Sequence, residues 1–257
     1  MRLVYKFNIG KNEEISKLCK VSNNLYNQAL YVFRETLKNE SKWLSYFELD
    51  KILKDTRNLD GEINYRLLKA QCSQQVLKLL DKNIKSYYES VRDYKKHPNK
   101  YKEKPGLPKY RKRGSEFNMY YTNQNCRIRN GKIILSKELS IDIPQYEKYS
   151  YLLENFKQIR ILPNHIGYRI EVIYEVEDVE IPKRKEEKIA SIDLGIDNLA
   201  TIVSEDFTII FSGKFVKSHN QSFNKTLAKL NSIKDLQKMK GTTKRIKKLY
   251  YDREQYI

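Results

Sequence analysis

The segment IASIDLGIDNLATIV, residues 189–203, carries the strongest structural signal in the C-terminal part of this 257-residue chain. An apolar run ends at Asp193, Gly195 allows the backbone to turn, and Leu199 to Val203 leads back beside the first run. Residues 208–211 form another short apolar run, and a basic helix is expected behind it from about 218 to 240. The pattern predicts a strand, a tight turn and two further strands that form a meander ahead of a helix.

This order of elements is typical of the opening of a ribonuclease H-like fold, which carries an aspartate on its first strand. Asp193 occupies that position. In such folds, carboxylates hold two divalent cations that stabilise the attacking and leaving oxygens of a phosphodiester. The plainer interpretation is that Asp193 only caps a turn, as aspartates at strand ends often do. A phosphate-cradling hairpin of the sugar-kinase and actin type is disfavoured, because that hairpin lies near the N-terminus of its chains.

The composition points to a polyanionic partner. The chain has 50 Lys and Arg against 32 Asp and Glu, a formal net charge of +18. Hydrophobic residues reach 40%, which excludes wholesale disorder. No segment has the length and apolarity of a membrane span or of a signal peptide, so we expect a cytoplasmic protein without membrane contact. Cys19, Cys72 and Cys126 are far apart, which predicts three buried thiols and neither a disulfide framework nor a zinc site.

The N-terminal half begins with an alternating strand, residues 2–9, and then changes to helical periodicity. Apolar stripes predict helices over about 12–39 and about 62–94. Between them, Ser45 and Glu48 have the spacing of a capping box and predict a short helix. The three helices are expected to form a small bundle.

The segment from Lys95 to Arg113 has nine Lys or Arg and one acid. Its three prolines keep the backbone extended, and tyrosines interrupt the cations. A charge run of this kind is often a solvated linker, but cations interleaved with aromatic rings favour a nucleic-acid contact, because cations bind phosphates while rings stack on bases. A second basic stretch, residues 225–257, has ten Lys or Arg against three acids. The residues expected to bind nucleic acid are Lys104, Lys109, Tyr110, Arg111, Lys112, Arg113, Lys244, Arg245, Lys247 and Lys248.

Two β-hairpins are predicted between these basic stretches. The first joins residues 126–129 to 132–135 through Asn-Gly, and the second joins 158–162 to 167–176 through a turn that contains His165. His165 is interpreted as a turn residue, because no second metal ligand lies at a suitable spacing. With the N-terminal strand, the hairpins are expected to form a small β-barrel into which the helical bundle is inserted. Residues 181–188 are expected to be a linker.

The order of these parts resembles the TnpB/OrfB-type transposon-encoded proteins, the family of RuvC-like nucleases related to type V CRISPR effectors. The resemblance rests on LKAQCSQQVLKLLDK (68–82), KPGLPKYRK (104–112), SIDLGIDNLAT (191–201) and KMKGTTKRIKK (238–248). It implies an α+β chain with a wedge-type β-barrel at 1–10 and 114–182, an inserted helical recognition lobe at 11–96 and a basic linker at 97–113. The N-terminal part of a RuvC-like domain follows at 183–257. It also implies binding of a guide RNA and of DNA, with Mg²⁺ as the cofactor of the complete family enzyme.

The resemblance also implies what this sequence does not supply. The family's nuclease site needs a Glu and a second Asp from later strands, with a zinc ribbon between them, and the sequence ends within a predicted helix before these positions. We therefore expect a C-terminally truncated protein in which Asp193 is a vestigial first carboxylate that holds metal only if a partner completes the site. Three interpretations stay open: a binding protein that has lost cleavage, a nuclease completed by a separate C-terminal polypeptide, and a basic RNA-binding module in which Asp193 is structural. Asp252 and Glu254 are expected to be surface partners of Lys248 or Arg253.

Overall fold

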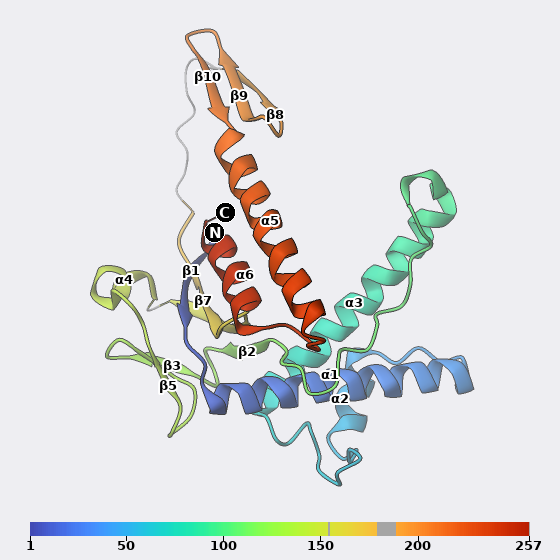
Figure 1. Cartoon of the computed structure of the whole chain (residues 1–257). Coiled ribbons are helices and arrows are strands. Elements are labelled where there is room, and N and C mark those ends of the chain that lie inside the picture. The colour runs from blue at the N-terminus through green and yellow to red at the C-terminus, as the bar shows by residue number, and fades with distance from the viewer. Residues whose placement is uncertain (154, 179–188, 257) are drawn as a thin grey trace. The chain divides into compact units, whose positions relative to one another are not determined.

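The computed structural model describes residues 1–153, 155–178 and 189–256. The chain divides into two compact units, Met1–Glu177 and Asp178–Ile257 (Figure 1). The linker predicted at 181–188 lies outside the described residues. Within the described part, no helix is long and apolar enough to span a membrane.

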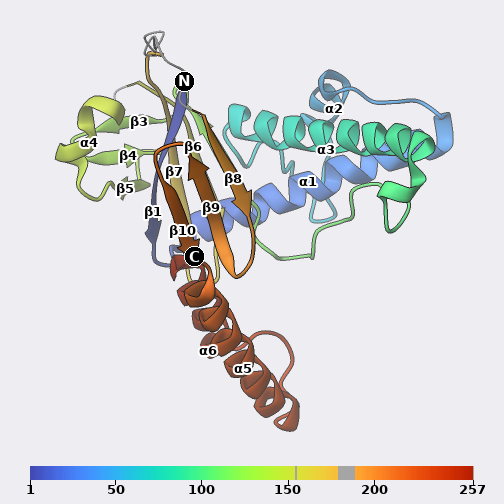
Figure 2. The same cartoon turned by 90° about the horizontal axis from the view of Figure 1, so that it is seen from above.

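The three predicted helices are present in the first unit as α1 (Glu13–Glu40), α2 (Tyr46–Leu53) and α3 (Ala70–Lys96). The backbone N–H of Ile15 donates to the side chain of Asn12, which caps α1. The predicted capping box of Ser45 and Glu48 is formed at the start of α2. Helices α1 and α3 pack against each other along their apolar stripes (Figure 2).

Helix α3 begins at Ala70 and not near residue 62 as its periodicity predicted. The intervening residues form turns because their side chains bond to other helices. The amide of Asn64 donates to Oε1 of Gln28 at 2.9 Å, and the hydroxyl of Tyr65 donates to Asp50 at 2.6 Å. These tertiary hydrogen bonds compete with the backbone hydrogen bonds of a helix in this segment. Its apolar residues therefore pack into the core without forming a helix.

The strands of the first unit form two sheets. One has the order β1 (Arg2–Ile9), β7 (Tyr168–Glu175), β6 (Phe156–Pro163) and β2 (Met119–Thr122), with antiparallel neighbours. The other joins the short strands β3 (Arg127–Arg129), β4 (Lys132–Ile134) and β5 (Ser140–Asp142). Four elements of this unit had no sequence prediction: strands β2 and β5, helix α4 (Tyr146–Leu153) between β5 and β6, and a 3₁₀ turn, η1 (Pro98–Lys100), after α3.

Both predicted hairpins are confirmed. The first turns at Asn130 and Gly131, which have φ of 50° and 71°, as a type I′ turn requires. His165 lies in the turn between β6 and β7. A single barrel was expected, but the described strands of this unit form two separate sheets. No pairing joins them, because β3, β4 and β5 pair only among themselves and β2 pairs only with β6. In the order of elements, the three helices come between β1 and the other strands of the four-stranded sheet.

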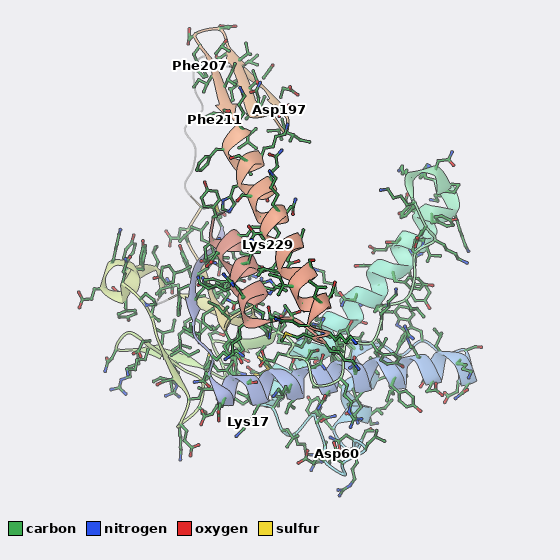
Figure 3. All side chains as sticks on the ribbon, viewed as in Figure 1. Lys17, Asp60, Asp197, Phe207, Phe211 and Lys229 are labelled. Atoms are coloured by element: carbon green, nitrogen blue, oxygen red, sulfur yellow. The ribbon has the colours of Figure 1, made fainter. Side chains whose placement is uncertain are left out.

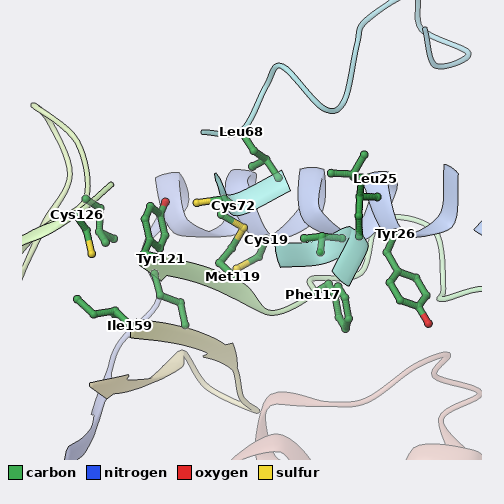
Figure 4. Packing of buried hydrophobic residues seen from close by; sticks show 14 of the residues in the cluster. Cys19, Leu25, Tyr26, Leu68, Cys72, Phe117, Met119, Tyr121, Cys126 and Ile159 are labelled. Atoms are coloured by element: carbon green, nitrogen blue, oxygen red, sulfur yellow. The ribbon is translucent and has the colours of Figure 1, made fainter. Parts of the chain in front are cut away.

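One hydrophobic core joins the helices to both sheets of the first unit (Figure 4). Cys19, Cys72 and Cys126 are buried free thiols in this core, as predicted. Burial raises the pKa of Cys72 and of Cys126 to about 12. The three cysteines therefore behave as small apolar side chains.

The second unit begins with the predicted meander, in the order β10 (Thr208–Ser212), β9 (Asn198–Ser204) and β8 (Ala190–Leu194). Helix α5 (Lys214–Leu236) follows, starting about four residues before its predicted position, and packs against α6 (Lys244–Tyr256). Gly213 lies between β10 and α5, where a Cβ atom would come within 2.2 Å of the carbonyl oxygen of Ile196. Only glycine fits this approach of the two backbones.

Candidate nucleic-acid interface

The basic segment lies in an extended conformation along α1, and we call residues 104–113 the basic strap. Three side chains of α1 hold its backbone carbonyls. Asn23 donates to the carbonyl of Lys112 at 3.1 Å, and Asn27 donates to that of Arg111 at 2.9 Å. The guanidinium of Arg34 donates to the carbonyl of Pro108 at 2.5 Å. Because the three side chains lie on one face of α1, the strap follows the helix axis.

Two of the predicted binding residues in the strap are themselves held by the scaffold. The guanidinium of Arg111 lies 4.0 Å from the ring centre of Phe117, and its Nε donates to Asn23 at 3.2 Å. The guanidinium of Arg34 lies over the ring of Tyr110, 4.8 Å from the ring centre, yet 47% of Tyr110 stays exposed. Both residues therefore help to fix the strap, whatever else they contact.

The remaining cations of the strap point to solvent. Lys104, Lys109, Lys112 and Arg113 are exposed, and none of them forms an ion pair with any residue in the described ranges. Because α1 already fixes the backbone of the strap, binding a polyanion loses little conformational entropy of that backbone. The strap is thus a prepared row of positive charge.

A second cationic feature, not predicted from the sequence, lies between α3 and the four-stranded sheet. It is a groove of about 360 Å³, with lining residues Gln75, Lys78, Leu79, Lys82, Tyr120, Gln158 and Arg160. Nε of Arg160 donates to Gln158 at 2.9 Å, which orients the guanidinium. Tyr120 and Arg160 are partners in the register of β2 and β6. The helical spacing of Lys78 and Lys82 was visible in the sequence, but their meeting with Arg160 depends on the packing of α3 against β2.

In the second unit, the predicted cations Lys244, Arg245, Lys247 and Lys248 occupy the start of α6. Lys248 forms an ion pair with Asp252 at 2.9 Å, as predicted for this acid. The N-terminal end of a helix has a partial positive charge that favours acidic residues in the first turn, but the first turn of α6 contains none. Positive charge at this end of a helix favours the approach of an anion.

Asp193 is an exposed residue of β8 and pairs in register with Thr201 of β9. The nearest acid in sequence, Asp197, forms an ion pair with Nζ of Lys217 at 2.6 Å and lies beside the meander (Figure 3). Over the described ranges, no three His, Cys, Asp or Glu side chains gather closely enough to hold a metal ion. The structure thus places Asp193 on the first strand of the meander without bringing a second carboxylate to it among those residues.

Comparison with known proteins gives one family match. Residues 171–256 match the OrfB_IS605 family, described as "Probable transposase". No curated protein matches the chain.

Among solved structures, the chain is similar to a Cas12f1–sgRNA–target DNA complex, with 14% identity and a TM-score of 0.33 over 100% of this chain and 66% of that one. It is also similar to a CRISPR-Cas12f ternary complex, with 13% identity and a TM-score of 0.38 over 95% of this chain and 57% of that one. The chain therefore spans less than two thirds of the length of either relative. The family match covers residues 171–175 of β7 and the described second unit, and it agrees with the resemblance expected from the sequence: over residues 171–256 this chain is similar to the OrfB-type transposases.

Proposed function

We propose that this chain binds RNA and DNA through phosphate contacts, as a transposon-associated protein of the TnpB/OrfB type. The observation that carries the proposal is the basic strap, whose backbone is tied to α1 while four of its cations stay free. The groove of Lys78, Lys82 and Arg160 supplies a second cationic surface in the same unit. The family's description as a transposase agrees with DNA as one partner. A guide RNA is the second partner that the resemblance implies.

The parts of the fold take their proposed roles from the same resemblance. The two sheets of the first unit share one core and correspond to the wedge-type barrel, residues 1–10 and 114–182. Helices α1 to α3 correspond to the recognition lobe, residues 11–96, and 97–113 to the basic linker. The meander with Asp193 on its first strand corresponds to the start of a RuvC-like domain, residues 183–257.

We further propose that the polypeptide of these 257 residues does not cut DNA by itself. A two-metal phosphodiesterase needs several carboxylates to offset the charge of two Mg²⁺ ions, and only Asp193 stands at a position that matches the family. Asp197 is compensated by Lys217. In the complete family enzyme, Mg²⁺ would stabilise the charge that develops on the phosphodiester oxygens.

One observation favours a second candidate, a nuclease completed by a companion polypeptide. One face of the meander consists of apolar side chains in register: Ile192 with Ile202 and Ile209, and Leu194 with Ala200 and Phe211. Ile192 is 61% exposed and Leu194 is 77% exposed. An apolar sheet face of this kind is usually covered in a folded domain. Asp193 lies between Ile192 and Leu194 on β8, so its side chain is on the opposite face of the sheet. A companion polypeptide would therefore have to reach both faces to cover the apolar one and to bring carboxylates to Asp193.

The binding proposal is tested by the salt dependence of affinity. We expect the affinity for a fluorescein-labelled RNA or DNA to fall by ~10³ or more between 50 and 200 mM salt, if about six or more phosphates are contacted. Replacing Lys109, Lys112 and Arg113 together with Ala should lower the slope of log affinity against log salt by about 3, because each lost phosphate contact removes about one counterion.

The matched control removes the same charge elsewhere. Lys11, Lys17 and Lys20 are exposed at or near the start of α1, and their triple Ala variant should keep the slope of the unmodified protein. Of these three lysines, Lys17 is labelled in Figure 3. An affinity that does not depend on salt, or equal slopes for the two triple variants, would contradict the proposal. RNA binding without any DNA binding would instead support the basic RNA-binding module.

A further inference from the structure

A pocket of about 380 Å³ lies on the helical part of the first unit, and none of its lining residues belongs to the strap. Its lining residues are Trp43, Lys85, Tyr88, Glu89 and Arg92. Trp43 precedes α2, and the other four belong to one side of α3, at spacings of three, four and seven residues. Trp43 is the only tryptophan of the chain.

The indole of Trp43 is held between two other rings. Its ring centre lies 4.8 Å from that of Tyr88 at an interplanar angle of 59°, and 5.5 Å from that of Phe33 at 88°. Phe33 belongs to the buried core, so it anchors the indole from the inside. Trp43 nevertheless keeps 36% of its area exposed. A large ring that is fixed but partly uncovered offers a flat surface for stacking.

Charged groups surround this aromatic surface. Arg92 is exposed and forms no ion pair within the described part of the chain, whereas Lys85 is paired with Asp81 at 2.7 Å. Glu89 is exposed and can accept a hydrogen bond from an amino group of a base. The pocket thus combines a stacking surface, a free cation and an acceptor.

We propose that this pocket binds one unpaired base of a single-stranded nucleic acid, stacked on Trp43 and Tyr88, with Arg92 on an adjacent phosphate. The inference rests on the proposed nucleic-acid function and adds to it a single-strand contact outside the strap. Aromatic side chains beside cations are the combination by which proteins hold single strands, because every base has a face that stacks while the backbone needs positive charge. A base within a duplex is already stacked and paired, so a duplex leaves the pocket empty.

The sole tryptophan makes the test direct. The full chain is titrated with a fluorescein-labelled 20-nucleotide oligouridine at low salt, and fluorescence anisotropy and Trp43 emission are recorded in parallel. We expect quenching of Trp43 with the same midpoint as the anisotropy change. A 20-base-pair RNA duplex should change the anisotropy through phosphate contacts and leave the emission of Trp43 unchanged.

Variants separate stacking from charge. Trp43→Ala should weaken single-strand binding by about 5- to 150-fold and leave duplex binding unchanged, whereas Trp43→Phe, which retains a ring on Phe33, should recover most of the loss. Arg92→Ala should weaken single-strand binding more than Lys17→Ala, a matched exposed cation on α1. Circular dichroism of each variant excludes loss of fold as the cause.

The outcomes distinguish this inference from the proposed function. Anisotropy that reports binding while Trp43 emission stays constant, or a Trp43→Ala variant that binds single strands normally, would overturn the pocket and leave the phosphate-binding proposal intact. No binding of either probe in anisotropy would overturn both. Equal quenching by single strand and duplex would refute recognition of an unpaired base.

Discussion

The attachment of the basic strap to α1 can be tested at a single residue, Asn27. Its amide donates to the carbonyl of Arg111 at 2.9 Å, and its Oδ1 accepts from the backbone N–H of Arg111 at 2.8 Å. The side chain thus satisfies both backbone groups of one strap residue. Asn27→Ala removes both hydrogen bonds, each of which contributes about 0.5–1.5 kcal/mol. Together they stabilise the attached strap by about 1–3 kcal/mol.

Such a loss should increase the fraction of molecules in which the strap is detached from α1 by about 5- to 150-fold. Trypsin reports this fraction, because the strap contains cleavage sites after Lys109, Arg111 and Lys112, and cleavage of a rapidly reclosing segment follows the population of its open form. We expect the rate of cleavage within residues 104–113, followed by mass spectrometry, to rise by this factor in Asn27→Ala.

Asn24→Ala is the matched control. Asn24 is an exposed residue on the same helix, so its replacement brings the same gain in helix propensity without touching the strap. Asn27→Asp keeps the acceptor for the N–H of Arg111 and should lie between the two Ala variants. Equal cleavage rates for Asn24→Ala and Asn27→Ala would refute the argument that α1 holds the strap.

Three other predictions follow from the site and the core. With Mg²⁺ and a matched guide and target, the purified chain should bind but not cut, and Asp193→Asn should leave the affinity unchanged; cleavage that depends on Asp193 in a gel assay of this chain alone would contradict this expectation. The N–H of Ser45 and the ammonium of Lys42 lower the pKa of Glu48 from 4.5 to about 2. The ionised Glu48 therefore stabilises the fold above pH ~4.5, and this contribution is lost as the pH falls toward 2. The melting temperature of Glu48→Gln should be lower than that of the unmodified protein at neutral pH and should approach it near pH 2. Because burial raises the pKa of Cys72 and Cys126 to about 12, these thiols should react with Ellman's reagent at pH 8 only after unfolding, and rapid reaction of the folded protein would show that the core is open.

The elements with strong local signals could be predicted from the sequence. Asn12 and Ser45 mark the starts of α1 and α2 because a polar side chain satisfies free backbone N–H groups there, and this is a local event. Asn130 and Gly131 mark a hairpin because few residues adopt a positive φ. The meander around Asp193 could also be predicted from local signals, because two apolar runs flank Gly195, where the chain turns between β8 and β9.

The start of α3 and the barrel could not be predicted in this way. The periodicity before Ala70 is helical, but hydrogen bonds of Asn64 and Tyr65 to distant residues form turns there. Strand β2 has only four residues, and its place beside β6 depends on pairing across more than thirty residues. Long-range pairing leaves no mark in a short window of sequence, so a barrel was expected where two sheets are found.

At the candidate site, the kinds of chemical group could be predicted from the sequence, whereas the groups that are free to bind a partner follow from the packing of the fold. Positive charge, rings and prolines between 95 and 113 follow from composition alone. That Arg111 is held by Phe117 and Asn23 while Lys109 is free follows from the packing of the strap on α1. The same holds for the groove of Arg160 and the pocket of Trp43, which exist because helix α3 brings side chains distant in sequence within a few ångströms of each other. Charge is a property of each residue, whereas the availability of that charge is a property of its neighbours in space.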